Sequence, residues 1–155
     1  MQLKKILCPV DFSACSVHAL KEALTLAERF QAELTVLHCS EGARYVRPDL
    51  AGWASTGDNR PIHEVVRDEA LAELGALRLR LDDPPGVIWR VEEGRAIETI
   101  LEEANAGLYD LVVLGTHGRT GLSHILLGSV AERVVRHATC PVLTLRAALE
   151  AEQPA

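Results

Sequence analysis

The chain has 155 residues, of which 48% are hydrophobic and 25% charged, so it is expected to fold as one ordinary globular domain. Its formal net charge of −6 argues against a general nucleic-acid-binding protein, which needs a basic surface. No apolar run approaches the ~18 residues that would span a membrane, and the first residues lead into a strand-like segment rather than a signal peptide, so we expect a cytoplasmic protein with neither a nucleic-acid nor a membrane partner.

The first third of the chain alternates between strand-like and helix-like patterns. Residues 6–10 form a short apolar run and predict a strand. Residues 13–30 carry apolar side chains at helical spacing and predict a helix, for which Ser13 is a suitable N-cap. Residues 34–39 predict a second strand. The stretch 40–60 has no clear period, and we expect a long loop there.

The remainder of the chain continues this alternation. Pro61 suits the first turn of a second helix, whose apolar face runs to Leu81 before the segment 82–86 stops it. In chain order, the elements that follow are strand 87–91, helix 96–106, strand 110–114, helix 129–137 and strand 142–145. We place the domain at residues 1–146 and a soft C-terminal tail at residues 147–155.

Strands that alternate regularly with helices favour an α/β fold, in which a parallel sheet carries helices on both faces. Right-handed crossovers leave few topologies, and we predict a Rossmann-like, five-stranded sheet with the strand order 3-2-1-4-5. In such a sheet a ligand binds at the carboxyl ends of the strands where the winding direction reverses. Those ends belong to the strands at 6–10 and 110–114, which lead into Asp11 and into the segment 115–118.

A glycine pattern lies between the apolar run 111–114 and the last predicted helix. It consists of Gly115 and Gly118, nine further residues, and the pair Gly128-Ser129. Glycines let the backbone approach a bulky anion, and a helix N-terminus adds unpaired N–H groups and the positive end of the helix dipole. Together these features predict a site for the phosphates of a nucleotide, whereas the first two glycines alone could simply end a strand and turn the chain.

The same pattern resembles the signature of the universal stress protein family, G-x2-G-x9-G-[ST], at every fixed position. The segments 6–13, 34–38 and 138–143 also look like the family's first strand and acidic turn, its second strand and the entry to its last strand. The resemblance implies an adenine nucleotide alpha hydrolase-like sheet and membership of the ATP-binding branch. It further implies a homodimer through Val142–Leu145 and a role in stress resistance or signalling.

The resemblance also implies a set of nucleotide-binding residues. From the base to the γ-phosphate, these are Pro9, Asp11, Cys39, Leu114, Gly115, Gly118, Gly128, Ser129, Val130 and Arg119. The first three lie at the base and ribose, the next two pass under the ribose, and the rest present N–H groups or, in the case of Arg119, a charged donor to the phosphates. Bound ATP normally carries Mg²⁺ on phosphate oxygens and water, so we expect no dedicated protein metal site.

Several residues have alternative roles. Asp11 could serve only as a cap for the first helix, and Ser129 begins a capping-box pattern in which its hydroxyl caps its own helix. His38 fits a hydrogen-bonded structural histidine at the end of a strand. His117 and His124 fit exposed loop histidines better than catalytic or metal-binding residues.

The favoured interpretation is an ATP-binding regulatory protein. The phosphate-binding pattern is complete, while the sequence has no P-loop lysine motif and no recognisable Ser–His–acid grouping or metal-ligand cluster. We therefore name no catalytic residue. One alternative is a slow ATPase, supported by Arg119, Mg²⁺ and the glycine loop. Another is a dimeric partner-binding scaffold without nucleotide. Cys15, in the first turn of a helix, is also a candidate redox-sensing thiol.

Overall fold

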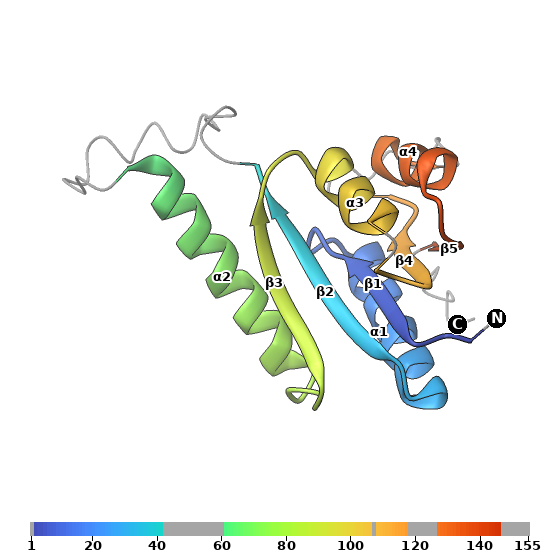
Figure 1. The fold of residues 1–155 in the computed structure, drawn as a ribbon. Coiled ribbons are helices and arrows are strands. Elements are labelled where there is room, and N and C mark those ends of the chain that lie inside the picture. The colour runs from blue at the N-terminus through green and yellow to red at the C-terminus, as the bar shows by residue number, and fades with distance from the viewer. Residues whose placement is uncertain (1, 42–60, 107, 118–126, 147–155) are drawn as a thin grey trace, which may run out of the picture.

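The computed structural model describes residues 2–41, 61–106, 108–117 and 127–146. Its strands are β1 (Lys5–Pro9), β2 (Glu33–Ser40), β3 (Val87–Glu93), β4 (Leu111–Gly115) and β5 (Val142–Leu145). Its helices are α1 (Ala14–Phe30), α2 (Ile62–Arg80), α3 (Ala96–Asn105) and α4 (Ser129–His137). Strands and helices follow one another in the predicted order (Figure 1). None of the described helices is both long and apolar enough to cross a membrane.

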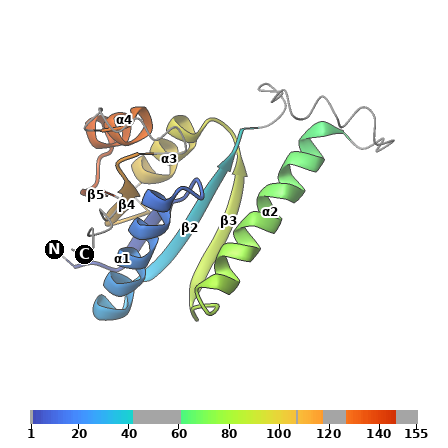
Figure 2. The ribbon, with the colours of Figure 1, turned by 180° about the vertical axis from the view of Figure 1, so that it is seen from behind.

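The strands form one parallel sheet in the order β3-β2-β1-β4-β5, which confirms the predicted fold class. The central strand is β1, whose Ile6 pairs with Leu34 of β2 on one side and Leu111 of β4 on the other. The chain winds outward from β1 to β3 and then returns to β4, so the winding direction reverses between β1 and β4. Helix α2 lies on the β3 side of the sheet, and α4 lies with β5 on the opposite side (Figures 1 and 2).

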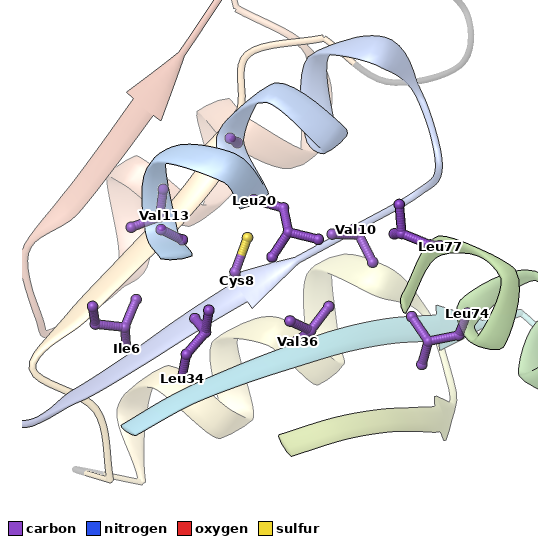
Figure 3. Close-up of a cluster of buried hydrophobic side chains, with 11 residues drawn as sticks. Ile6, Cys8, Val10, Leu20, Leu34, Val36, Leu74, Leu77 and Val113 are labelled. Atoms are coloured by element: carbon purple, nitrogen blue, oxygen red, sulfur yellow. The ribbon is translucent and has the colours of Figure 1, made fainter. Parts of the chain in front are cut away.

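The apolar side chains of the strands serve two cores, one on each face of the sheet. On one face, Ile6, Cys8 and Val10 pack with residues of β2, α1 and α2, as Figure 3 shows. On the other face, Leu7 packs with residues of α3 and α4. Because neighbouring residues of β1 contribute to different cores, its sequence is a continuous apolar run rather than an alternating one.

The two helices that follow β1 and β4 start in different ways. Ser13 is the N-cap of α1, as predicted, and its Oγ accepts a hydrogen bond from the N–H of Ser16 at 3.2 Å. The N-cap of α4 is Gly128, and Ser129 occupies the first helical position, so the capping-box prediction for Ser129 is wrong. The N–H of Gly128 donates to the O of Thr116 at 2.6 Å, and this bond fixes where α4 begins.

Element boundaries differ little from those that the sequence predicts. Strand β1 begins and ends one residue earlier, and β3 extends two residues further, to Glu93. Of the predicted loop at 40–60, Ser40 belongs to β2, and residues 42–60 lie outside the described part of the chain. The predicted tail at 147–155 lies outside it as well.

Candidate functional site

A cavity of about 280 Å³ lies at the carboxyl ends of β1, β2 and β4, where the winding direction of the sheet reverses. Helices α3 and α4 complete its walls. Its lining consists of residues 9–11, 16, 37–39, 96, 100, 114–117 and 128–131. The side formed by β2 and α3 is mostly apolar, whereas the segments after β1 and β4 contribute polar groups. Sheets of this class bind their ligands at this position.

Eight of the ten predicted nucleotide-binding residues line this cavity. They come from four segments that are far apart in the sequence, and they are Pro9, Asp11, Cys39, Leu114, Gly115, Gly128, Ser129 and Val130. The other two, Gly118 and Arg119, lie outside the described residues. The strand order explains why the eight meet, since β1 lies between β2 and β4 and the ends of all three strands are therefore neighbours.

Asp11 lies in the turn between β1 and α1. Its Oδ1 accepts hydrogen bonds from the N–H of Ser13 at 3.0 Å and from the Oγ of Ser13 at 2.5 Å, and its own N–H donates to the Oγ of Ser16 at 3.3 Å. Phe12, between Asp11 and Ser13, has a left-handed backbone conformation, with φ of 64°. Asp11 therefore stabilises the start of α1 and also lines the cavity, so its two predicted roles are compatible.

His38 and Cys39 form part of the β2 side of the cavity. The Nδ1 of His38 lies 2.8 Å from the O of Val10, and its ring centroid lies 4.4 Å from that of Phe12, which confirms the predicted structural histidine. Burial, helped by nearby glutamates and opposed by a hydrogen bond with Thr99, raises the pKa of the Cys39 thiol to about 12. At neutral pH Cys39 is thus an uncharged, weakly polar part of the wall.

The glycines of the motif permit close backbone packing at the end of β4. A Cβ at Gly115 would lie 2.9 Å from the carbonyl carbon of Cys15, and a Cβ at Gly128 would lie 2.9 Å from the O of Thr116. Real Cβ atoms essentially never approach other atoms so closely. Gly115 therefore allows α1, and Gly128 allows the N-terminus of α4, to pack against the end of β4. Close packing therefore accounts for both glycines independently of their predicted role in admitting a phosphate.

Helix α4 presents its N-terminus to the cavity, where Gly128, Ser129 and Val130 contribute to the lining. The unpaired N–H groups and the positive end of the helix dipole favour an anion at this end. No lysine or arginine is found among the described lining residues, and the carboxylate of Asp11 lies on the β1 side. Among the described lining residues, the N-terminus of α4 is therefore the feature that suits an anion. In the described part of the chain, no group of three or more His, Cys, Asp or Glu side chains could hold a metal ion.

Sequence reasoning missed the α3 side of the cavity and the two residues that follow β4. Ala96 and Ile100 line the cavity from α3, and the only signal for them is the four-residue spacing that places both on one helical face. His117 was expected to be exposed, but it is partly buried and lines the cavity. Its Nδ1 lies 2.9 Å from the Oγ1 of buried Thr116, which holds the ring there. His124 lies outside the described residues.

Comparisons with known proteins agree with this fold. The model of the Universal stress protein family matches residues 2–146. Universal stress protein MJ0531 from Methanocaldococcus jannaschii is 37% identical over 145 residues, which cover 92% of this chain and 82% of that protein. The structure of universal stress protein UspA from Lactobacillus plantarum is 30% identical, with a TM-score of 0.75, and the match covers 94% of this chain and 99% of that one. A universal stress protein solved in complex with cAMP is 22% identical, with a TM-score of 0.60, and the match covers 95% of this chain and 99% of that one.

Proposed function

Because the chain belongs to the universal stress protein family, we propose that it binds ATP with Mg²⁺ in the cavity at the ends of β1 and β4. We further propose that it acts as a nucleotide-dependent regulatory protein in a stress response. The observation that carries this proposal is the meeting of eight residues of the predicted set around one cavity, at the switch point of the sheet. The family match over residues 2–146 supports a domain that ends near residue 146.

The charges around the cavity support one orientation of the nucleotide. The phosphates lie at the N-terminus of α4, because the N–H groups and the helix dipole attract them there. The carboxylate of Asp11 would repel phosphates, so it faces the ribose. The base then lies on the apolar side, against Leu37, Ala96 and Ile100. Mg²⁺ would be held by phosphate oxygens and water, as is usual for nucleotide-bound magnesium.

The lining of the cavity and one related structure both support an adenine nucleotide as the ligand class. The apolar side of the cavity suits a planar base, and the N-terminus of α4 suits a phosphate. In addition, one universal stress protein of the same fold is described as a complex with cAMP. The order of affinity among ATP, ADP, AMP and cAMP is a matter for competition experiments, in which we expect ATP to bind most tightly.

The proposal can be tested by calorimetric titration of nucleotide-stripped protein with Mg-ATP. The variant Ala96→Phe adds a ring to the apolar side of the cavity, and we expect it to bind ATP at least about tenfold more weakly than the wild type. Ala72→Phe, on an exposed position of α2, is the matched control and should bind as the wild type does. Gly128→Glu is a poorer test, because any Cβ at this position conflicts with the O of Thr116.

The outcomes of this titration separate the candidate functions. Micromolar or tighter binding that Ala96→Phe weakens would support the proposal. Absence of binding by the wild type to any adenine nucleotide would contradict it and favour a scaffold without nucleotide. Phosphate release at about 1 per second or faster, an ordinary enzymatic rate, would favour an ATPase over a regulatory protein.

We also propose that the protein forms a homodimer through Val142–Leu145. These residues form β5, which lies at one edge of the sheet and, within the described residues, pairs only with β4. An edge strand offers backbone N–H and C=O groups to a second strand, and the side chain of Leu143 in this strand is exposed. Both features support β5 as a self-association surface.

A further inference from the structure

Thr116, which directly follows β4, connects several elements. It is only 4% exposed, and its N–H donates to the O of Leu145 at the end of β5, at 2.8 Å. Its O accepts from the N–H of Gly128, the N-cap of α4, at 2.6 Å. Its Oγ1 lies 2.9 Å from the Nδ1 of His117 and 3.8 Å from the Sγ of Cys15 in α1. Because its polar groups all have partners, this buried residue fixes β5, α4 and α1 relative to the end of β4.

Cys15 lies behind the same part of the cavity wall. Its Sγ donates to the O of Leu145 at 3.1 Å, the carbonyl that also accepts from the N–H of Thr116. Gly115 makes this approach possible, since a Cβ there would lie 3.0 Å from the Sγ of Cys15. Cys15 is buried and is not among the residues that line the cavity. The thiol therefore contacts the residues at the end of β4 without lining the cavity, and its burial argues against the redox-sensing alternative.

We propose that Cys15 and Thr116 are positioning residues for the nucleotide, an inference that rests on the proposed function. Together they hold the segment 115–117 in place, and through the O of Thr116 they also hold the N-terminus of α4. Cys15 does this without contacting the ligand. Removing its thiol lets the wall shift, and the N–H groups of α4 then meet the phosphates in a poorer geometry.

The first test compares Cys15→Ala, Cys15→Ser and the wild type by calorimetric titration with Mg-ATP. Loss of one hydrogen bond corresponds to about a three- to tenfold decrease in affinity. We therefore expect Cys15→Ala to bind Mg-ATP that much more weakly than the wild type. Cys15→Ser keeps a donor and should stay within about twofold of the wild type. Cys8→Ala is the matched control, since Cys8 is a buried cysteine outside the cavity lining. It should lower the thermal midpoint of the ligand-free protein but leave the affinity unchanged.

A second pair of variants tests whether the hydroxyl of Thr116 helps to hold the segment 115–117 in place. Thr116→Val removes the hydroxyl at nearly constant volume, whereas Thr116→Ser keeps it. We expect the valine variant to bind ATP about three- to tenfold more weakly and the serine variant to bind nearly as the wild type does. Thr35→Val, at another buried threonine outside the cavity lining, controls for a general loss of stability. The double variant Cys15→Ala with Thr116→Val should lose less affinity than the product of the single losses, because both residues act on one wall.

These results distinguish the inference from the proposed function. If the wild type binds ATP and Cys15→Ala binds equally well, Cys15 has no positioning role and the proposed function stands. If the wild type binds no adenine nucleotide, both are wrong. If Cys15→Ala does not fold, the comparison of Thr116→Val with Thr116→Ser decides, and equal affinities of these two variants would overturn the inference.

Discussion

Gly128 has an ordinary backbone conformation, with φ of −69° and ψ of 161°, so conformational freedom does not explain the glycine. A side chain is excluded because its Cβ would lie 2.9 Å from the O of Thr116. We therefore predict that Gly128→Ala destabilises the ligand-free protein by about 1–3 kcal/mol, the usual cost of overpacking. Urea unfolding of the protein without nucleotide measures this effect separately from any loss of binding.

Gly75, in the middle of α2, is the matched control for this substitution. A Cβ at Gly75 would have no heavy atom within 4 Å. Gly75→Ala should therefore stabilise the protein by about 0.5–1 kcal/mol, because alanine favours the helix and restricts the unfolded chain. If both alanine variants shifted the unfolding midpoint in the same direction, the contact between Gly128 and Thr116 would not be what requires glycine at position 128.

At the scale of secondary-structure elements, Asp110 joins the start of β4 to the start of β1. Its Oδ2 accepts hydrogen bonds from the N–H of Lys4 at 2.8 Å and from the N–H of Lys5 at 2.9 Å. These backbone hydrogen bonds, together with the lysine charges, hold the pKa of Asp110 below its ordinary value. The charged carboxylate is therefore the form that stabilises this connection.

This lowered pKa predicts the pH dependence of one variant. A carboxylate whose pKa is lower in the folded than in the unfolded state stabilises the fold above the unfolded pKa, about 4. That stability is lost as the pH falls through the folded pKa. Asp110→Asn lacks the charge, so its thermal midpoint should lie below that of the wild type at neutral pH, and the difference should close in acid. Glu22→Gln, at an exposed position of α1, controls for the loss of a negative charge. A difference that stayed constant with pH would contradict this role of the carboxylate.

At the scale of the whole molecule, the features that could be predicted are those that depend on residues close together in the sequence. The apolar run of β1 and the Ser13 cap are local signals, and the glycine pattern indicated the side of the cavity that β4 and α4 form. Ala96 and Ile100 could not be assigned to the cavity, because their place depends on how α3 packs on the sheet and against α4. The hydrogen bond from Thr116 to β5 could not be predicted either, since the accepting carbonyl of Leu145 is distant in the sequence.

Substitutions at the two edges of the sheet test whether the molecule forms the proposed dimer through β5. Leu143 in β5 is 37% exposed and Ile88 in β3 is 40% exposed, so a lysine at either position changes a comparably exposed site on an edge strand. If β5 pairs with a second copy, Leu143→Lys forces an ammonium group toward a desolvated interface, whereas Ile88→Lys leaves that interface intact. We expect Leu143→Lys to weaken dimerisation at least about tenfold in sedimentation equilibrium, a cost of about 1.4 kcal/mol, and Ile88→Lys to match the wild type. A monomeric wild type, or a larger loss from Ile88→Lys, would rule out β5 as the dimer edge.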